Sequence, residues 1–212
     1  MLDFLRYGVI LSLIISLISL AILIIKTFSF GRSPLNAKPQ GDVKRGILYA
    51  FGRGMMPWEK ESAGKHLLTY VAGILYHIGV FMSILYLFTL LFLIKLPVSF
   101  IYMFRITFLV GFLCGFALLL KRWLAPTMRA LSCPDDFISN VIVDIFLVLA
   151  FLHTFFSHLL LLFFLFAIFL FLYIPIGKIR HCVFFFIVRI LFGHFYGFRG
   201  IVPPQKKVTF EK

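Results

Sequence analysis

The chain has 212 residues, of which 62% are apolar and 18% aromatic, and its mean hydropathy is +1.05. Soluble globular chains are only about 45–50% apolar, so the composition excludes a soluble protein and indicates one membrane domain over residues 1–212. The formal net charge is +13, but the basic residues gather in a few segments, as in the cytoplasmic loops of membrane proteins. We therefore expect contact with membrane lipid and no nucleic-acid partner. The three cysteines lack C-x-x-C spacing, which argues against an iron–sulfur cluster within this chain.

Long apolar runs predict an all-α membrane protein with five transmembrane helices in a bundle. About 20 apolar residues suffice to cross a bilayer, whereas residues 137–176 form a run of 40 residues with one formal charge, Asp144. At about 1.5 Å per residue this run is twice the hydrocarbon thickness, so we expect two helices with a turn near residues 153–158. The expected helices cover about residues 5–26, 66–95, 99–121, 137–154 and 157–178. A loop over 27–65 and a basic amphipathic tail over 179–200 make up most of the remaining chain.

Basic residues are abundant in three segments and scarce between them. Lys and Arg number eight in residues 26–66, three in residues 121–136 and seven in residues 177–212. The amino end holds Arg6 alone, the turn after the second helix holds Lys95 alone, and the turn at 153–158 holds none. Because cytoplasmic loops carry the excess of Lys and Arg, these counts predict an N-terminus outside and a cytoplasmic C-terminus.

His77 lies near the middle of the uncharged run Leu67–Ile94. An ionisable side chain within a membrane helix is costly to keep there and is a candidate functional residue. His181, just past the last long apolar run, is the candidate partner, because two histidines from two membrane helices can hold one haem iron. The competing interpretation is that His77 hydrogen-bonds a neighbouring helix.

Three sequence motifs stand in order over about residues 67–195. They are YHIGVF around His77, LLLKRWLAPTMRALSCPDDF between the third and fourth helices, and YIPIGKIRH at the end of the fifth. Together they resemble the respiratory nitrate reductase gamma-subunit family, which includes the membrane cytochromes of heterodisulfide reductase-like and sulfite-reduction-associated complexes. The resemblance implies a b-type cytochrome that reacts with membrane quinone or quinol and exchanges electrons with a cytoplasmic iron–sulfur subunit, heterodisulfide reductase-like or ferredoxin-like.

The resemblance also implies the number of haems and the cellular location. Family members with two haems use two histidines on the second helix and two on the fifth. His77 and His181 match one pair, whereas the positions of the other pair hold Leu87 and Phe163. We therefore expect one haem b, with two as an alternative. The chain would be an electron-transfer subunit of a respiratory complex in a prokaryotic cytoplasmic membrane, and not a stand-alone enzyme.

Other histidines compete for these roles. His66 precedes His77 by eleven residues, which returns to nearly the same helix face, and its charged surroundings place it at the same membrane boundary as His181. It is the alternative ligand. His153 and His158 lie near the outer ends of the fourth and fifth helices and are candidates for a quinone site, a proton exit or a second haem. Hydrogen bonding within their turn is the structural alternative.

Two charged groups lie within the apolar runs. Arg105 is a candidate partner for a haem propionate, or else extends towards the membrane surface. Asp144 could receive a proton or meet a basic residue such as Lys121. A function of another class remains open as well, namely a haem-free membrane anchor or small transporter, which polar residues along one helix face would indicate.

Overall fold

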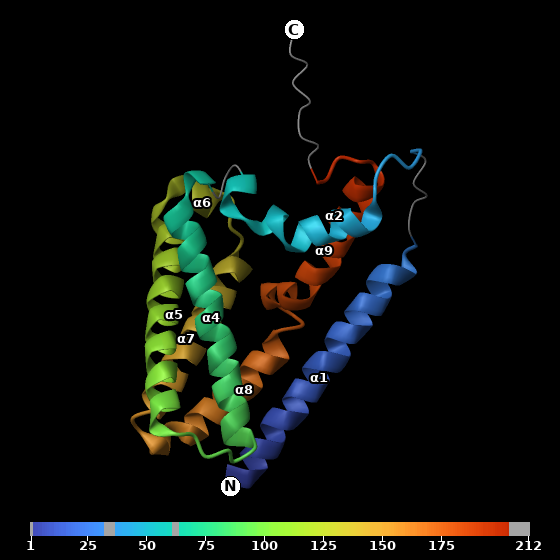
Figure 1. Cartoon of the computed structure of the whole chain (residues 1–212). Coiled ribbons are helices and arrows are strands. Elements are labelled where there is room, and N and C mark those ends of the chain that lie inside the picture. Colours follow the sequence, from blue (N-terminus) through green and yellow to red (C-terminus); the bar gives the residue numbers. More distant parts are fainter. Residues whose placement is uncertain (1, 32–36, 61–63, 204–212) are drawn as a thin grey trace. The chain divides into compact units, whose positions relative to one another are not determined.

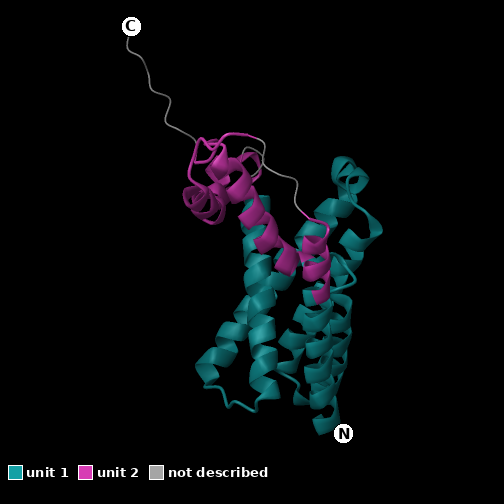
Figure 2. Ribbon diagram, turned by 90° about the vertical axis from the view of Figure 1, so that its right-hand side faces the viewer, with its two compact units in different colours: residues 1–21, 68–180 teal, residues 22–67, 181–212 magenta. Residues whose placement is uncertain are grey.

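The computed structural model describes residues 2–31, 37–60 and 64–203. Every regular element in these ranges is helical and none is a strand, which confirms the prediction of an all-α protein. The chain divides into two compact units, shown in different colours in Figure 2. The first unit comprises residues 1–21 and 68–180, and the second comprises residues 22–67 and 181–212.

The first unit is a helical bundle. Its elements, in chain order, are the first part of α1 (Leu2–Ser29), α4 (Leu67–Leu91), α5 (Val98–Leu124), α6 (Pro126–Ala130), α7 (Pro134–His153), the 3-10 turn η3 (Ser157–Leu159), α8 (Leu160–Tyr173) and the 3-10 turn η4 (Lys178–Arg180). The helices α4, α5 and α7 run side by side (Figure 1), and α7 also packs on α8.

Prolines and a capping box set where the helices of this bundle begin. Pro97 precedes α5, while Pro126 and Pro134 are the first residues of α6 and α7. Proline suits the first turn of a helix because the N–H it lacks would have no partner there. At the start of α7 the backbone N–H of Cys133 donates to the Asp136 carboxylate at 2.9 Å, so a side chain satisfies this helix end.

The last apolar segment differs from the expected helix over 157–178. It forms η3 followed by α8, which ends at Tyr173. The sequence Pro175-Ile176-Gly177 follows, and proline and glycine both interrupt helices. A new helix, α9 (His181–Phe198), begins after η4. His181 is therefore the first residue of α9 and does not lie in the last turn of the preceding helix.

Five helical segments of the described chain are long and apolar enough to cross a membrane. They are Leu2–Ser29, Leu67–Leu91, Val98–Leu124, Pro134–His153 and Lys178–Phe198. The fifth is the segment expected as an amphipathic tail, whereas Ser157–Tyr173 is a shorter apolar helix. Five helices of spanning length are thus present, although the fifth is a different part of the chain from the one expected.

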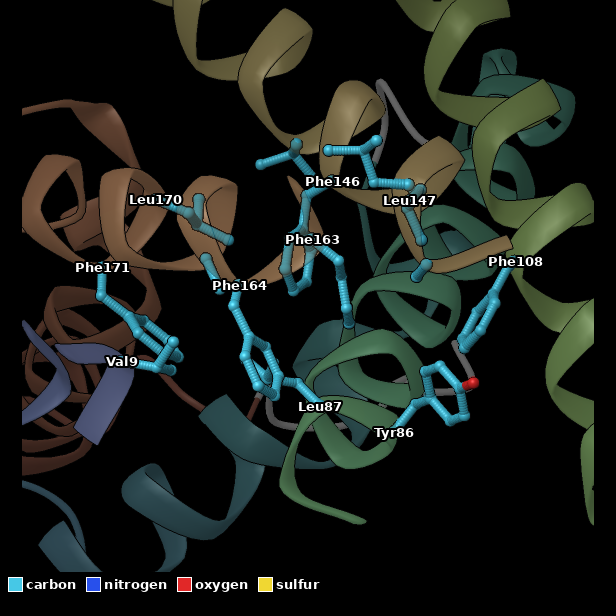
Figure 3. Close-up of a cluster of buried hydrophobic side chains, with 14 of the residues drawn as sticks. Val9, Tyr86, Leu87, Phe108, Phe146, Leu147, Phe163, Phe164, Leu170 and Phe171 are labelled. Carbon is cyan, nitrogen blue, oxygen red and sulfur yellow. The ribbon is translucent and has the colours of Figure 1, made fainter. Parts of the chain in front are cut away.

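Phenylalanine fills the core of the first unit. The fully buried rings come from α5, α7 and α8, and they are Phe104, Phe108, Phe146, Phe163 and Phe164. Figure 3 shows Phe108, Phe146, Phe163 and Phe164 together with Tyr86 and Leu87 of α4. The rings of Phe146 and Phe163 stack with their centroids 5.1 Å apart. This aromatic packing joins α7 to α8 and brings both against α4 and α5.

Two glycines bring α4 and α5 close together. A Cβ added to Gly79 would lie 2.8 Å from the Cα of Gly111 and 3.0 Å from the carbonyl oxygen of Thr107. Small residues permit this approach between membrane helices, where packing rather than water exclusion drives association.

The second unit is built on the contact between α2 (Val43–Phe51) and α9. Glycines again line the contact, since a Cβ on Gly193 would lie 2.5 Å from the Cα of Ile47. Between α2 and α4 are the 3-10 turns η1 (Arg53–Met55) and η2 (Pro57–Glu59). The Glu59 carboxylate accepts hydrogen bonds from Arg53 Nε at 2.5 Å and from the Tyr49 hydroxyl at 2.9 Å. These two donors hold the pKa of Glu59 below its usual value.

Candidate functional site

The imidazole of His77 is exposed on α4, and one of its nitrogens bonds to the helix backbone. Its Nδ1 lies 2.7 Å from the carbonyl oxygen of Gly73, one turn earlier. Because a carbonyl only accepts, Nδ1 must carry the hydrogen. In the neutral ring the lone pair then resides on Nε2, the nitrogen that points away from the backbone contact. This tautomer is the one that a metal-binding histidine with a backbone partner adopts.

Gly73, whose carbonyl bonds to this imidazole, has open space around it. A Cβ built there would meet no heavy atom of the described chain within 4 Å, the backbone of its own helix apart. Gly79, on the same helix, instead packs directly against Gly111. The two glycines of α4 therefore have different surroundings, one open and beside His77, the other closed by α5.

The other two candidate ligands are also exposed. His181 begins α9, and His66 lies in the turn before α4. Both belong to the second compact unit, whereas His77 belongs to the first. The pairing of His77 with His181 stays a prediction, and so does the competing pairing of His66 with His181.

His153 and His158 have different environments. His153 is buried, and its Nδ1 lies 2.9 Å from the hydroxyl of Tyr86, which joins α7 to α4. Its ring stacks on Phe163 with centroids 6.0 Å apart, and Figure 3 shows Tyr86 beside Phe108 on the α5 side. His158 is exposed in η3. His153 thus makes a helix-to-helix hydrogen bond rather than one within its own turn.

Arg105 of α5 binds the turn between α7 and α8. Its Nε donates to the Thr154 hydroxyl at 3.0 Å, and a terminal nitrogen donates to the Thr154 carbonyl at 2.6 Å. The guanidinium carbon also lies 3.9 Å from the centre of the Phe155 ring. Arg105 therefore satisfies a backbone group that the turn leaves without a helical partner, and a role beside a haem propionate stays a prediction.

A buried polar cluster joins α4, α5 and α7, and it is not among the sites expected from the sequence. The amide of Asn140 donates towards the carboxylate of Asp144 at 3.0 Å, the hydroxyl of Tyr76 at 3.2 Å and the carbonyl of Gly115 at 3.3 Å. The sequence feature that indicates this cluster is the spacing of Asn140 and Asp144, because residues four apart lie on the same face of a helix. Lys121, the expected partner of Asp144, instead donates to the Thr69 hydroxyl at 2.5 Å.

We expect Tyr86→Phe to lower the free energy of unfolding by about 1–3 kcal/mol, because it leaves a buried imidazole nitrogen without its partner. Denaturant titration of the purified protein in detergent micelles measures this loss. Tyr102→Phe is the matched control, since the Tyr102 side chain is exposed on α5, and we expect it to change stability little. Equal losses in the two variants would contradict a contribution from the Tyr86–His153 hydrogen bond.

No family model, curated protein or solved structure matches this chain. The family resemblance therefore rests on the three sequence motifs alone.

Proposed function

We propose that the chain is the haem-b membrane subunit of a quinone-reactive oxidoreductase complex. The observation that carries the proposal is His77, a histidine in the middle of a charge-free helix of spanning length. Its Nδ1 lies 2.7 Å from the Gly73 carbonyl oxygen, and its imidazole is exposed on the surface of α4. An imidazole whose Nδ1 bonds to the backbone, so that Nε2 carries the lone pair, has the tautomer that a haem-binding histidine requires.

His77 and His181 would provide the two axial nitrogens. The hydrogen bond to Gly73 fixes the tautomer of His77 and orients its ring. Apolar side chains along α4, such as Phe81, would keep water away from the ligand. Haem b, when bound, supplies one-electron transfer, and the protein's part is to hold it and to set its surroundings.

Charge distribution supports the proposed orientation and the class of partner. The segment 26–66 holds eight Lys and Arg residues and the segment 177–212 holds seven, which together are fifteen of the 21 in the chain. We propose that these segments, α9 included, lie at the cytoplasmic face of a prokaryotic membrane, with the N-terminus outside. Their positive charge would attract an acidic face of an iron–sulfur subunit, while quinone or quinol would react from the lipid phase.

The test is a reduced-minus-oxidised visible spectrum with haem quantitation on the full-length protein, purified from cells that assemble cytochromes. One low-spin b-type haem per chain would support the proposal. Two haems would mean that His66, His153 or His158 also binds iron. A chain without haem under these conditions would overturn the proposal.

A haem-free transporter is the second candidate, and the buried cluster of Tyr76, Asn140 and Asp144 favours it. Ionisable groups inside a helical bundle commonly mark the path of an ion or proton. A protein without haem that still needs Asp144 for its cellular activity would support this second function.

A further inference from the structure

The carboxyl group of Asp144 is buried, and only one of its two oxygens has a hydrogen-bond partner. The residue retains 5% of its accessible surface. Its Oδ2 accepts a hydrogen bond from Asn140 at 3.0 Å. Its Oδ1 is fully buried and has no hydrogen-bond partner in the described chain. Buried polar atoms are nearly always paired, so this oxygen requires an explanation.

The surroundings are shaped to hold this carboxyl group. Gly115 of α5 lies against it, and a Cβ at this position would collide with Oδ1 of Asp144 and with the ring of Tyr76. The Tyr76 hydroxyl in turn donates to the backbone carbonyl of Asn140 at 3.3 Å. Side chains or backbone from three helices thus enclose the carboxyl group.

Three basic side chains of the first unit bind other groups. On α5, Lys121 donates to Thr69 and Arg122 donates to the Asp136 carbonyl at 2.7 Å. Lys178 of η4 pairs with the Asp136 carboxylate at 2.6 Å. The titratable group that faces Asp144 from α4 is the phenol of Tyr76. Among the described residues, Asp144 takes part in none of the ion pairs. An ionised carboxylate here would have no counter-charge, which is costly inside a membrane protein.

We propose that Asp144 is a proton-binding site within the first unit. The carboxyl group rests as the neutral acid with its hydrogen on Oδ1, and it releases and regains that one proton. Towards the Pro134 end of α7, the Tyr173 hydroxyl bonds to the Asp135 carboxylate and lies 3.2 Å from the Ser139 hydroxyl. Proton exchange with water would take place from this end. The site is independent of haem binding.

Infrared spectroscopy of the full-length protein in lipid nanodiscs tests the proposal without any added reagent. We expect wild type to show a carboxylic acid C=O band that shifts in deuterated water and is absent from Asp144→Asn. Asparagine has the shape of the neutral acid, so the fold should persist. Asp144→Glu keeps the acid and should shift the band, which provides a second variant. Asp136→Asn is the matched control, because the ion pair with Lys178 keeps Asp136 ionised, and the band should remain.

Titration distinguishes a proton from a metal cation. As the pH is raised past the midpoint, the band should weaken about tenfold per pH unit, with the same midpoint in sodium chloride and in choline chloride. A band that sodium chloride removes at constant pH would overturn the proposal in favour of a sodium site. A wild-type spectrum without a band assignable to Asp144 would overturn it as well, whether or not the protein contains haem.

Discussion

His77→Ala is expected to abolish the b-type spectrum of the purified protein and to lower its haem content by more than about tenfold. Loss of a partner that merely orients a metal ligand already costs about 10–100-fold in metal affinity, and removal of the ligand itself should cost at least as much. His181→Ala should have the same effect if the two histidines share one iron. Haem quantitation per chain and the reduced-minus-oxidised spectrum measure both losses.

Matched controls separate ligand loss from general damage to the fold. His158 is exposed in η3 and is not one of the two proposed ligands, so His158→Ala should retain the one haem that His77 and His181 would hold. Gly73→Leu leaves His77 unchanged and places a bulky side chain in the open space at Gly73, one turn from the imidazole. We expect it to lower haem content while thermal stability stays near that of wild type. Full haem occupancy in His77→Ala would refute the assignment of this ligand.

The second large effect is expected at the contact between α4 and α5. Gly79→Ala places a methyl group 2.8 Å from the Cα of Gly111 and 3.0 Å from the Thr107 carbonyl oxygen. Both are backbone atoms, so relief requires the helices to move apart. Overpacking of this kind costs about 1–3 kcal/mol. We expect a loss of this size in the free energy of unfolding, measured by denaturant titration in micelles.

Gly73→Ala is the control for this prediction, because it makes the same change on the same helix where the described chain leaves open space. Alanine is the better helix former by about 1 kcal/mol, so stability should stay level or rise slightly. A similar loss in both variants would show that the substitution acts through the helix itself and not through its contact with α5.

The sequence by itself determined that the protein is helical and where most of its helices lie. In lipid, backbone groups must be satisfied within the segment, so long apolar runs become helices. Proline then limits their extent, as at Pro97 before α5 and Pro134 at the start of α7. The same rule applied at Pro175 places the end of α8 at Tyr173, whereas the expected helix over 157–178 continues past that proline.

Contacts between helices were decided only by the tertiary structure. Periodicity places Asn140 and Asp144 on one face of α7, but it does not show that Gly115 of α5 makes room for the carboxyl group or that Tyr76 of α4 closes over it. Likewise, His153 and Arg105 were recognised as unusual residues in apolar runs. Their partners, Tyr86 and Thr154, are 67 and 49 residues away in the chain. Such pairings depend on how the helices pack, and local sequence patterns carry no information about side chains so distant along the chain.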